Sequence, residues 1–425
     1  MAREAPLTVV VIGAGIVGLC AALEIQRTGH RVVIIEPDEP GGRQAASYGN
    51  GTWLNPAAIM PISVPGLWRK IPGFLLDPTG PFTIRWRDLP GIAGWLMRFV
   101  CAGRSWARIE ACVSARYPLC RDTVTDHVAL ADEAGVPELI HRKGLIFVYR
   151  DRAEFVAEVR EWQMRAALGV RFSEITEAEL RRILPQLGQA YRFGARLDDG
   201  GQIADPGAYC RALMDLTIGR GATRVTARAT GFAIAGGRLS AVETEHGAVA
   251  CDRAVIAAGI GSCALARQAG DAVPLISERG YHVVIADPGL ELATGLMPSD
   301  GKMAVVLTPQ GLRLAGQVEL AATERPPDWR RTDILLGFAS SMFPALGDRL
   351  GSSTIDRWMG HRPSTPDGLP CIGAASACPQ VLHAFGHAHT GLIQAPATAK
   401  LVAALIDERT PPFDPSPYTA ERFGR

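Results

Sequence analysis

Val9–Gly18 reads VVVIGAGIVG, and this stretch decides the fold. Four β-branched apolar residues predict a buried strand, and the glycines after them predict a tight turn into a helix. Gly13 permits the turn, Gly15 lets a diphosphate approach bare backbone, and Gly18 lets the helix pack closely on the strand. The first turn of the helix offers free N–H groups to phosphates. The other residues that we expect at this dinucleotide-binding turn are Ala14, Ile16 and Val17.

The residues after this turn continue the same unit. A helix is predicted over residues 19–27, and Gly29 ends it. A second apolar strand over residues 31–35 then runs into Glu36 and Pro37. A carboxylate at the end of that strand binds ribose hydroxyls and repels a 2′-phosphate, so FAD or NAD is favoured over NADP. The alternative is a glycine-rich turn that binds nothing.

Composition narrows the class of protein. A chain of 425 residues predicts two domains. The formal net charge of +1 provides no broad field for nucleic acid. Nine cysteines without a CxxC pair or zinc spacing indicate a reducing compartment. No apolar run of about 20 residues is present and no signal peptide precedes the first strand, so we expect a cytoplasmic enzyme, with peripheral contact to the inner membrane face as an alternative.

Two segments between the motifs are open to more than one interpretation. The small residues of 45–51 predict a second backbone approach to a cofactor, in which Ser47 bonds a phosphate, or else an ordinary surface turn. Residues 61–106 alternate arginines with Trp68, Trp86, Trp95 and Trp106. Their apolar part, residues 91–100, could lie on a bilayer surface. We favour a helix that packs into the protein.

The rest of the chain alternates helices and strands. Thr176 and Glu179 form a capping box, and Asp205 before Pro206 starts another helix. Apolar strands at 221–225 and 252–256 are expected to join the nucleotide-binding sheet, and a small meander lies between them. The other expected helices cover 107–142, 153–167, 331–342 and 393–406, and the other expected strands cover 144–149, 274–287, 303–307 and 312–316.

Two late motifs carry the most information about chemistry. Residues 360–373 read GHRPSTPDGLPCIG, and residues 383–392 read HAFGHAHTGL before a long helix. Small residues at a helix start expose free N–H donors and a positive dipole end. Such a helix start stabilises the negative charge that a reduced flavin carries on its pyrimidine side.

These motifs occur together and in order with the glycine turn, Glu36 and the VIAAGIGS turn of residues 255–262. The chain thereby resembles the FAD-dependent amine and amino-acid oxidoreductases: glycine oxidase, D-amino-acid oxidase, sarcosine oxidase and, nearest in length and middle region, D-amino-acid dehydrogenase. The resemblance implies an α/β fold in which a Rossmann-type FAD-binding domain is interleaved with a mixed-sheet α+β substrate domain. The ranges implied are 1–60, 200–275 and 355–425 for FAD, and 61–199 and 276–354 for the substrate.

The resemblance also implies a set of cofactor contacts. Glu36 and the glycines of the first turn match the nucleotide contacts of the family. The remaining matches are Ser47, Asn50 and Gly51 in the second phosphate and flavin loop, Val225, Ala258, Gly259 and Gly261 near the adenine, and Gly386, His387, Thr390, Gly391 and Leu392 at the flavin ring. Sarcosine oxidases bond the flavin to a cysteine where Gly360 stands here, so non-covalent FAD is implied and Cys371 is expected in the core.

Arg362 matches the arginine that grips the substrate carboxylate in glycine and D-amino-acid oxidases. A guanidinium forks both carboxylate oxygens and stays charged. The alternative is an ion-pair residue before a proline. Two weaker candidates lie on a predicted strand: Tyr281 could bond the substrate carboxylate, and His282 could contact its amine. The alternative for each is an ordinary structural role in the strand. His389 or His387 could contact the flavin or the substrate, and His361 is a weaker candidate for such a contact. The spacing of the histidines does not suggest a metal site.

The resemblance implies oxidation of a D-amino acid or a secondary amino acid such as D-proline or a hydroxyproline isomer. Hydride passes to FAD, and the imino acid hydrolyses to a 2-oxo acid. Electrons are expected to leave to a quinone or another carrier. The alternatives are a glycine or sarcosine oxidase that produces hydrogen peroxide, and a flavin subunit of a larger dehydrogenase complex that is inactive alone.

Overall fold

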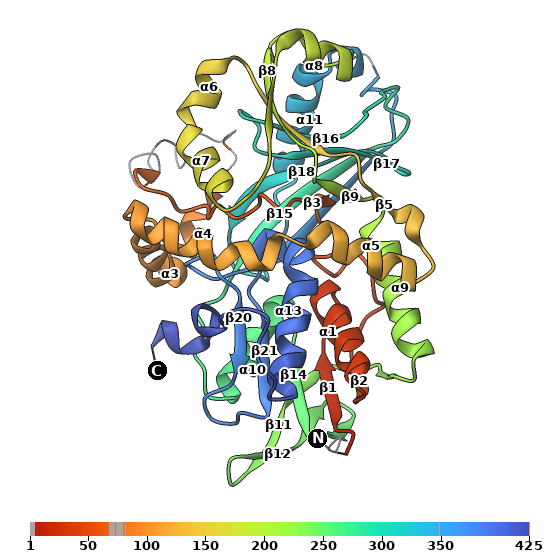
Figure 1. The fold of residues 1–425 in the computed structure, drawn as a ribbon, viewed down its shortest axis with the longest axis vertical. Coiled ribbons are helices and arrows are strands. Elements are labelled where there is room, and N and C mark those ends of the chain that lie inside the picture. Colours follow the sequence, from red (N-terminus) through yellow and green to blue (C-terminus); the bar gives the residue numbers. More distant parts are fainter. Residues whose placement is uncertain (1–4, 68–72, 74–79, 81, 348, 425) are drawn as a thin grey trace.

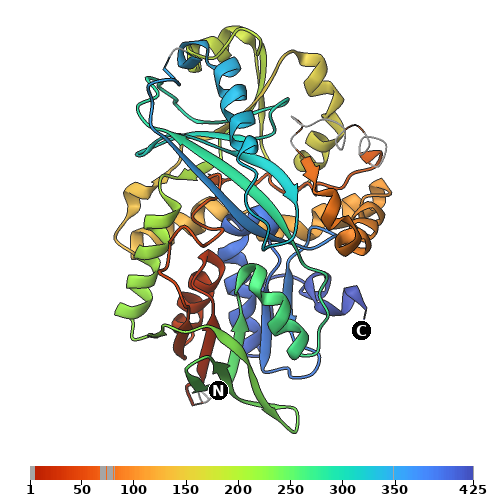
Figure 2. The same cartoon turned by 180° about the vertical axis from the view of Figure 1, so that it is seen from behind.

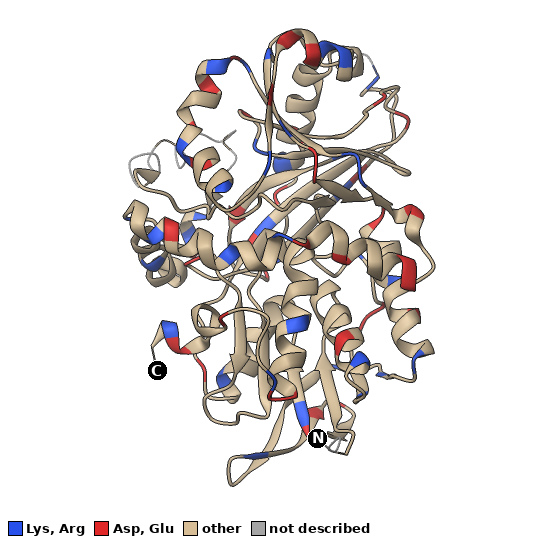
Figure 3. Cartoon of the chain, viewed as in Figure 1, with Lys and Arg blue, Asp and Glu red and all other residues tan. Residues whose placement is uncertain are grey.

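A six-stranded and a nine-stranded sheet organise the protein, which is described here from a computed structural model (Figure 1). The structure describes residues 5–67, 73, 80, 82–347 and 349–424. The smaller sheet occupies the half that holds both termini. The long strands of the larger sheet cross the other half, and the view from behind shows them running down towards the first sheet (Figure 2). Basic and acidic residues are interspersed over both halves, in keeping with the net charge of +1 (Figure 3).

The six-stranded sheet has the order β10-β2-β1-β14-β21-β20, in which only β20 runs antiparallel to its neighbour. The glycine-turn strand therefore lies inside the sheet, and the strands predicted at 221–225 and 252–256 join it as expected. This arrangement confirms a Rossmann-type domain. Its strands are β1 (Thr8–Ile12), β2 (Arg31–Ile35), β10 (Thr223–Val225), β14 (Arg253–Ile256), β20 (Cys371–Ala374) and β21 (Val381–Phe385).

Both faces of this sheet are covered, which explains the uninterrupted apolar run of β1. Val9 and Val11 face a core that they share with α1 (Ile16–Arg27), α9 (Pro206–Gly219) and α13 (Gly391–Ile406). Val10 and Ile12 face the opposite core, under α10 (Ser262–Gln268) and a three-stranded meander. The meander consists of β11 (Ala229–Ala235), β12 (Arg238–Thr244) and β13 (Gly247–Ala250).

Two glycines of the turn have no room for a side chain. A Cβ on Gly18 would lie 2.0 Å from the carbonyl oxygen of Gly13, and a Cβ on Gly13 would lie 2.5 Å from the carbonyl oxygen of Ala257. Gly13 also has a φ of +109°, which L-residues with side chains rarely adopt. The predicted roles of these glycines in the turn and in close helix packing are confirmed.

The nine-stranded sheet is mixed, as the resemblance implies. Its order is β19-β15-β18-β17-β16-β6-β8-β7, and β4 pairs with β18 in parallel beside that path. Most other pairs are antiparallel, but β16 and β6 are parallel. The strands are β4 (Phe82–Ile84), β6 (Leu145–Tyr149), β7 (Ser173–Ile175), β8 (Phe193–Leu197), β15 (Ile276–Ile285), β16 (Gly295–Pro298), β17 (Ala304–Thr308), β18 (Gly311–Leu320) and β19 (Ile355–Ser364).

Helices and a second three-stranded sheet complete the fold. Thr176 and Glu179 form the predicted capping box, and Asp205 caps α9. The predicted helix over 153–167 is broken at Glu158 into two. The remaining helices are α4 (Trp106–Cys120), α5 (Thr123–Glu133), α6 (Arg152–Ala157), α7 (Val159–Ala167), α8 (Glu177–Ile183), α11 (Arg330–Met342) and α12 (Pro344–Gly347), and the small sheet holds β3 (Trp53–Leu54), β5 (Ile140–His141) and β9 (Gly201–Ile203).

The arrangement of the elements departs from the expected domain ranges at two places. All six strands of the Rossmann sheet lie in the ranges expected for FAD, but β19, expected there too, pairs with β15 at the edge of the larger sheet. Helices α4 and α5, expected in the substrate domain, pack against α13. A division near residue 365 would follow the sheets better than one at 355.

The apolar segment of residues 91–100 forms the middle of α3 (Leu89–Ala102). Ile92, Trp95 and Phe99 are buried at helical spacing against Ile84 and Leu320, so the helix packs into the protein as we favoured. Over the part of the chain that is described, no helix has the length and apolar character needed to span a bilayer. The expected tryptophan and basic cluster at 68–70 lies outside the described residues.

Candidate active site and cofactor cleft

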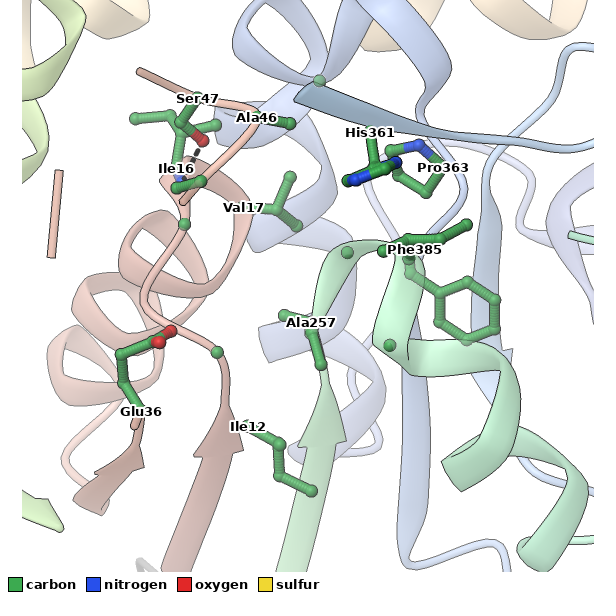
Figure 4. A pocket seen from close by; sticks show the side chains of 18 of the residues that line it. Ile12, Ile16, Val17, Glu36, Ala46, Ser47, Ala257, His361, Pro363 and Phe385 are labelled. Carbon is green, nitrogen blue, oxygen red and sulfur yellow. Dashed lines mark hydrogen bonds between the residues drawn. The ribbon is translucent and has the colours of Figure 1, made fainter. Parts of the chain in front are cut away.

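A cleft of about 560 Å³ opens at the carboxyl ends of β1, β2 and β14. Figure 4 shows Glu36 at one side of the cleft, Ser47 and Ile16 at the glycine turn, and His361 and Pro363 at the opposite side. Ligands bind at this edge of doubly wound sheets because the strand ends and helix N-termini meet there.

The glycine turn leaves space for a diphosphate. Among the described residues, a Cβ on Gly15 would meet only the hydroxyl oxygen of Ser47, at 3.4 Å. The Ser47 hydroxyl accepts a hydrogen bond of 3.0 Å from the amide of Ile16, the first residue of α1. The loop of residues 44–51 therefore approaches the start of α1, and residues of both line the cleft.

Two backbone amides hold the Glu36 carboxylate at the edge of the cleft. One carboxylate oxygen accepts the amide of Ala14 at 2.8 Å, and the other accepts the amide of Asp38 at 3.2 Å. Each oxygen keeps a lone pair that can accept from a hydroxyl. The amide of Glu36 in turn donates to the carbonyl of Val225 at 3.1 Å. Residues 228–230, rather than Val225 itself, line the neighbouring wall of the cleft.

Most of the residues expected to contact FAD line this cleft. Three of the others do not line it but support residues that do. Ala14 holds Glu36, Gly18 packs on Gly13, and Gly386 turns the chain with a φ of +85°. The expected residues that line the cleft are Gly13, Gly15, Ile16, Val17, Glu36, Pro37, Ser47, Asn50, Ala258, Gly259, Gly261, His387, Gly391 and Leu392.

Two buried side chains from the larger sheet hold the loop of residues 44–51, a role that the sequence analysis predicted for neither of them. Arg313 on β18 donates to the carbonyls of Tyr48 and Asn50 at 3.0 and 3.1 Å. Nδ1 of His282 on β15 lies 3.3 Å from the carbonyl oxygen of Gly49. Burial lowers the pKa of both groups, that of His282 to about 3, so the imidazole is neutral and donates.

A second cavity, of about 1060 Å³, lies between the cleft and the larger sheet. Ala46, Asn50 and Ala388 line both spaces, so the two meet. Most of its walls are apolar, and its polar groups include Glu278, Gln317, Arg362 and His389. Gly51 and Thr390, expected near the flavin, line this cavity rather than the cleft. An apolar space with few convergent polar groups is typical of a substrate site.

Arg362 lies flat over Gly280, where a Cβ would come within 2.2 Å of the guanidinium carbon. Its Nη1 donates to Glu278 Oε1 at 3.2 Å and to the carbonyl of Gln317 at 3.0 Å, and its Nη2 donates to the carbonyl of Gly316 at 3.4 Å. A guanidinium has five N–H donors. The Nε donor and one Nη2 donor therefore have no partner among the described residues.

Glu278 is the polar residue of this cavity that sequence reasoning missed. It faces Arg362 in the antiparallel register of β15 and β19 and is 4% exposed. Its Oε2 accepts the hydroxyl of Ser364 at 2.7 Å. The available signal was a pair of adjacent charged residues, Glu278 and Arg279, inside a strand that is buried along almost its whole length. Alternation along that strand separates the two onto opposite faces.

Tyr281 and His282 do not line the cavity, so we withdraw both as binding residues. The Tyr281 hydroxyl donates to Glu319 at 2.5 Å and accepts the amide of Asp328 at 3.0 Å, on the other face of β15 from Glu278. His282 stacks on Trp358 with a centroid separation of 5.0 Å while it holds the loop at Gly49. The sequence placed both on the correct strand, but it did not show which face or position opens onto the cavity.

The three histidines of the late motifs have different surroundings. His387 is buried, and its Nε2 lies 2.9 Å from the Thr398 hydroxyl oxygen. His361 lines the cleft, and its Nδ1 lies 2.7 Å from the Ser277 hydroxyl oxygen. His389 is exposed to the substrate cavity, where the surrounding protein lowers its pKa to about 4 even though the Glu278 carboxylate opposes the shift.

Buried neutral histidines predict a loss of stability in acid. Burial lowers the pKa of His127 to about 4 and those of His282 and His387 to about 3. The unfolded chain, with pKa values near 6.5, then binds more protons below about pH 6.5, so stability falls as the pH drops towards 4. We expect Tm to be level above pH 7 and the loss to reach up to about 2 kcal/mol per histidine at pH 5.

Thermal unfolding at pH 4.5, 5.5, 6.5 and 7.5 measures this dependence. His127→Gln should flatten it by one group, whereas the control His246→Gln, at a side chain that is 69% exposed, should leave it unchanged. A Tm that stays level from pH 4.5 to 7.5 in the wild type would contradict the prediction.

Metal ligation, and a covalent flavin bond at Gly360 or Cys371, find no support in the described residues. They contain no group of three metal-ligating side chains. All nine cysteines are free, and burial raises the pKa of the Cys371 thiol to about 12. Cys371 is fully buried, as expected for a core residue. A Cβ on Gly360 would lie 2.1 Å from the Trp358 ring, so this position cannot carry a flavin-bonding cysteine without displacing Trp358.

The glycine cradle, the free helix start and the Glu36 carboxylate together fit a dinucleotide such as FAD. Residues 8–405 match the family described as FAD dependent oxidoreductase, and the chain belongs to that family. FAD is accordingly its cofactor, and the protein is an FAD-dependent oxidoreductase.

Relatives of known name cover the whole chain. It is 45% identical over 415 residues to a D-amino-acid oxidase of Bradyrhizobium diazoefficiens, covering 98% of each chain. It is 29% identical to a D-amino acid dehydrogenase of Paramagnetospirillum magneticum, over 98% of this chain and 99% of that one. Among solved structures, glycine oxidase from Geobacillus kaustophilus has the same fold, with a TM-score of 0.76, 21% identity and coverage of 98% and 99%.

Proposed function

We propose that the protein oxidises a D-amino acid through its α-carbon, with Arg362 as the residue that binds the substrate carboxylate. The observation that carries the proposal is the pair of free Arg362 donors in a largely apolar cavity that meets the FAD cleft. The names of the relatives at 45% and 29% identity support D-amino acids as the substrate class.

The chain positions the substrate and excludes water. Bound FAD would supply the acceptor for a hydride from the α-carbon, which would turn the C–N bond into a C=N bond, and water would then hydrolyse the imino acid to a 2-oxo acid and ammonia. Arg362 offers its Nε and Nη2 edge to both carboxylate oxygens, which fixes the α-carbon in one place. The apolar walls desolvate the reacting carbon. Protein backbone at the start of α13, including Gly391, lies at the cleft and supplies N–H donors.

The walls of the cavity favour a substrate with a side chain. Trp53, Phe147 and Met297 are among the apolar residues that line it, and they offer contacts that glycine and sarcosine cannot use. We therefore place glycine and sarcosine below larger D-amino acids. Cyclic secondary amino acids such as D-proline and hydroxyproline isomers remain within the proposed class, because the carboxylate grip on Arg362 does not depend on the substitution of the amine.

The electron acceptor is where the named relatives differ. The sequence led us to expect a quinone or another carrier, as in a dehydrogenase, whereas the relative at 45% identity is named an oxidase. We propose molecular oxygen on the ground of that higher identity. We also propose that FAD is bound without a covalent link, because Gly360 has no room for a cysteine.

Oxygen uptake with a panel of amino acids tests the proposed function. We expect D-amino acids, but not their L-enantiomers, to drive uptake and to yield one hydrogen peroxide for each 2-oxo acid. Turnover only after a quinone or dye is added would move the protein to the dehydrogenases. No turnover with any D-amino acid and any acceptor would contradict the proposal and favour a subunit that needs a partner.

A further inference from the structure

We infer that Glu278 and Arg362 act as one charge pair that selects zwitterions, with Glu278 binding the amino group while Arg362 binds the carboxylate. The inference rests on the proposed function, because it names the part of the substrate that the second residue recognises. It assigns a specificity role to a residue for which neither the family match nor the relatives' names give one.

The geometry brings the two groups to one wall of the cavity. Glu278 on β15 and Arg362 on β19 are directly opposite in the antiparallel register, and both line the substrate cavity. Their side chains are 5% and 19% exposed, and the ion pair spans 3.2 Å from Oε1 to Nη1. The sheet backbone therefore fixes the spacing of the negative and positive groups.

Glu278 has unused acceptor capacity. Oε1 accepts only from Arg362 and Oε2 accepts only from the Ser364 hydroxyl, at 2.7 Å, among the described residues. A carboxylate has about four acceptor sites, so lone pairs on both oxygens stay available. A buried carboxylate with spare acceptors in a cavity is suited to an ammonium or amine, which has donors and no competing acceptor.

Charge balance gives the pair its selectivity. With Glu278 present, Arg362 contributes no net positive charge to this wall, so an anion that enters alone leaves the site with a net negative charge, which is costly away from water. An amino acid brings an ammonium with its carboxylate and keeps the total at zero. The other charged residues that line the cavity are two acidic and two basic ones, Glu158, Glu161, Arg165 and Lys302, so they add no net charge. His389 is neutral at working pH because its pKa is about 4.

The same balance bears on turnover. Oxidation and hydrolysis convert the substrate into a 2-oxo acid, which keeps the carboxylate and has lost the amine. The product is therefore a lone anion in a site that has no net charge to offer it. The pair thus binds substrate better than product and favours product release.

Glu278→Gln tests the inference because it predicts opposite changes for two ligands. We expect KM for the best D-amino acid of the panel to rise about 10- to 100-fold, since a charge-assisted hydrogen bond is lost. We expect the Kd of benzoate, a carboxylate without an amino group, to fall at least tenfold, because the positive charge of Arg362 is no longer neutralised. Perturbation of the bound flavin's absorption spectrum reports the benzoate affinity without turnover.

Two further variants separate specificity from structure. Glu278→Asp keeps the charge and should keep the weak binding of benzoate. Glu319→Gln is the matched control, since Glu319 is a buried carboxylate that binds Arg279 and Tyr281 on the other face of β15, outside the cavity. It should lower Tm and leave the ratio of the two affinities as in the wild type.

The outcomes distinguish this inference from the proposed function. Weakening of benzoate and amino acid together in Glu278→Gln would show that Glu278 only positions Arg362, and unchanged affinities would remove it from the site; either result overturns the inference. Failure of every amino acid to reduce the wild-type flavin would instead overturn the proposed function, whatever benzoate does.

Discussion

Arg362→Ala is expected to lower kcat/KM for D-amino acids by about 10²- to 10³-fold while FAD stays bound. The change removes the two donors that can fork the substrate carboxylate, and it also leaves Glu278 without its ion-pair partner at 3.2 Å. Loss of one member of a buried, hydrogen-bonded charge pair costs about 2–5 kcal/mol, and the expected range lies inside the roughly 30- to 5000-fold that this corresponds to. Steady-state kinetics measure the loss, and the flavin-to-protein ratio confirms that the cofactor is retained.

Arg357→Ala on the same strand is the control for this variant. Arg357 bonds Thr332 and Asp333 outside the two cavities, so its loss should leave kcat/KM near the wild-type value. Arg362→Lys should recover only part of the activity, because an ammonium cannot reproduce the planar fork. Wild-type kinetics in Arg362→Ala would remove Arg362 from the substrate site.

Gly15→Leu is expected to abolish FAD binding without unfolding the protein. A Cβ at this position would meet only Ser47 Oγ, at 3.4 Å, so the backbone tolerates a side chain. The longer leucine side chain would then occupy the place where the diphosphate approaches the start of α1. We expect a weakening of FAD affinity by at least about 100-fold, measured by titration of the apoprotein through flavin fluorescence, with a circular dichroism spectrum like that of the wild type.

Substitutions at two other glycines serve as controls for Gly15→Leu. Gly337→Ala lies on the exposed side of α11 with nothing within 4 Å of the new Cβ, and it should bind FAD normally. Gly13→Ala should fail to fold, since its Cβ would lie 2.5 Å from a backbone oxygen. A Gly15→Leu protein that keeps its full complement of FAD would place the diphosphate elsewhere.

The Rossmann half of the fold was predictable because its signals are local. The glycine turn, the helix after it and the strand that ends at Glu36 follow one another within 30 residues, and each glycine has a steric reason that the structure bears out at Gly13 and Gly18. Capping at Thr176 and Asp205 is also a matter of a few adjacent residues. Predictions of this kind need no knowledge of tertiary contacts.

The substrate side was less predictable because it depends on register and on strand face. Glu278 is important only because β15 and β19 pair with Glu278 opposite Arg362, and no local pattern specifies that pairing. The same uncertainty about position led us to propose Tyr281 and His282, whose polar atoms bind Glu319 and the carbonyl of Gly49 instead. The loop-holding contacts of Arg313 join residues more than 260 positions apart, beyond the reach of any motif.

Anaerobic reduction of the bound flavin tests the central claim most directly, because it needs no assumption about the electron acceptor. The holoenzyme is mixed without oxygen with D- and L-forms of alanine, phenylalanine and proline, and the flavin absorption is followed. We expect rapid bleaching by D-forms, none by L-forms, and loss of the response in Arg362→Ala. A flavin that stays oxidised with every D-amino acid, or that the L-forms bleach equally fast, would contradict the proposed function.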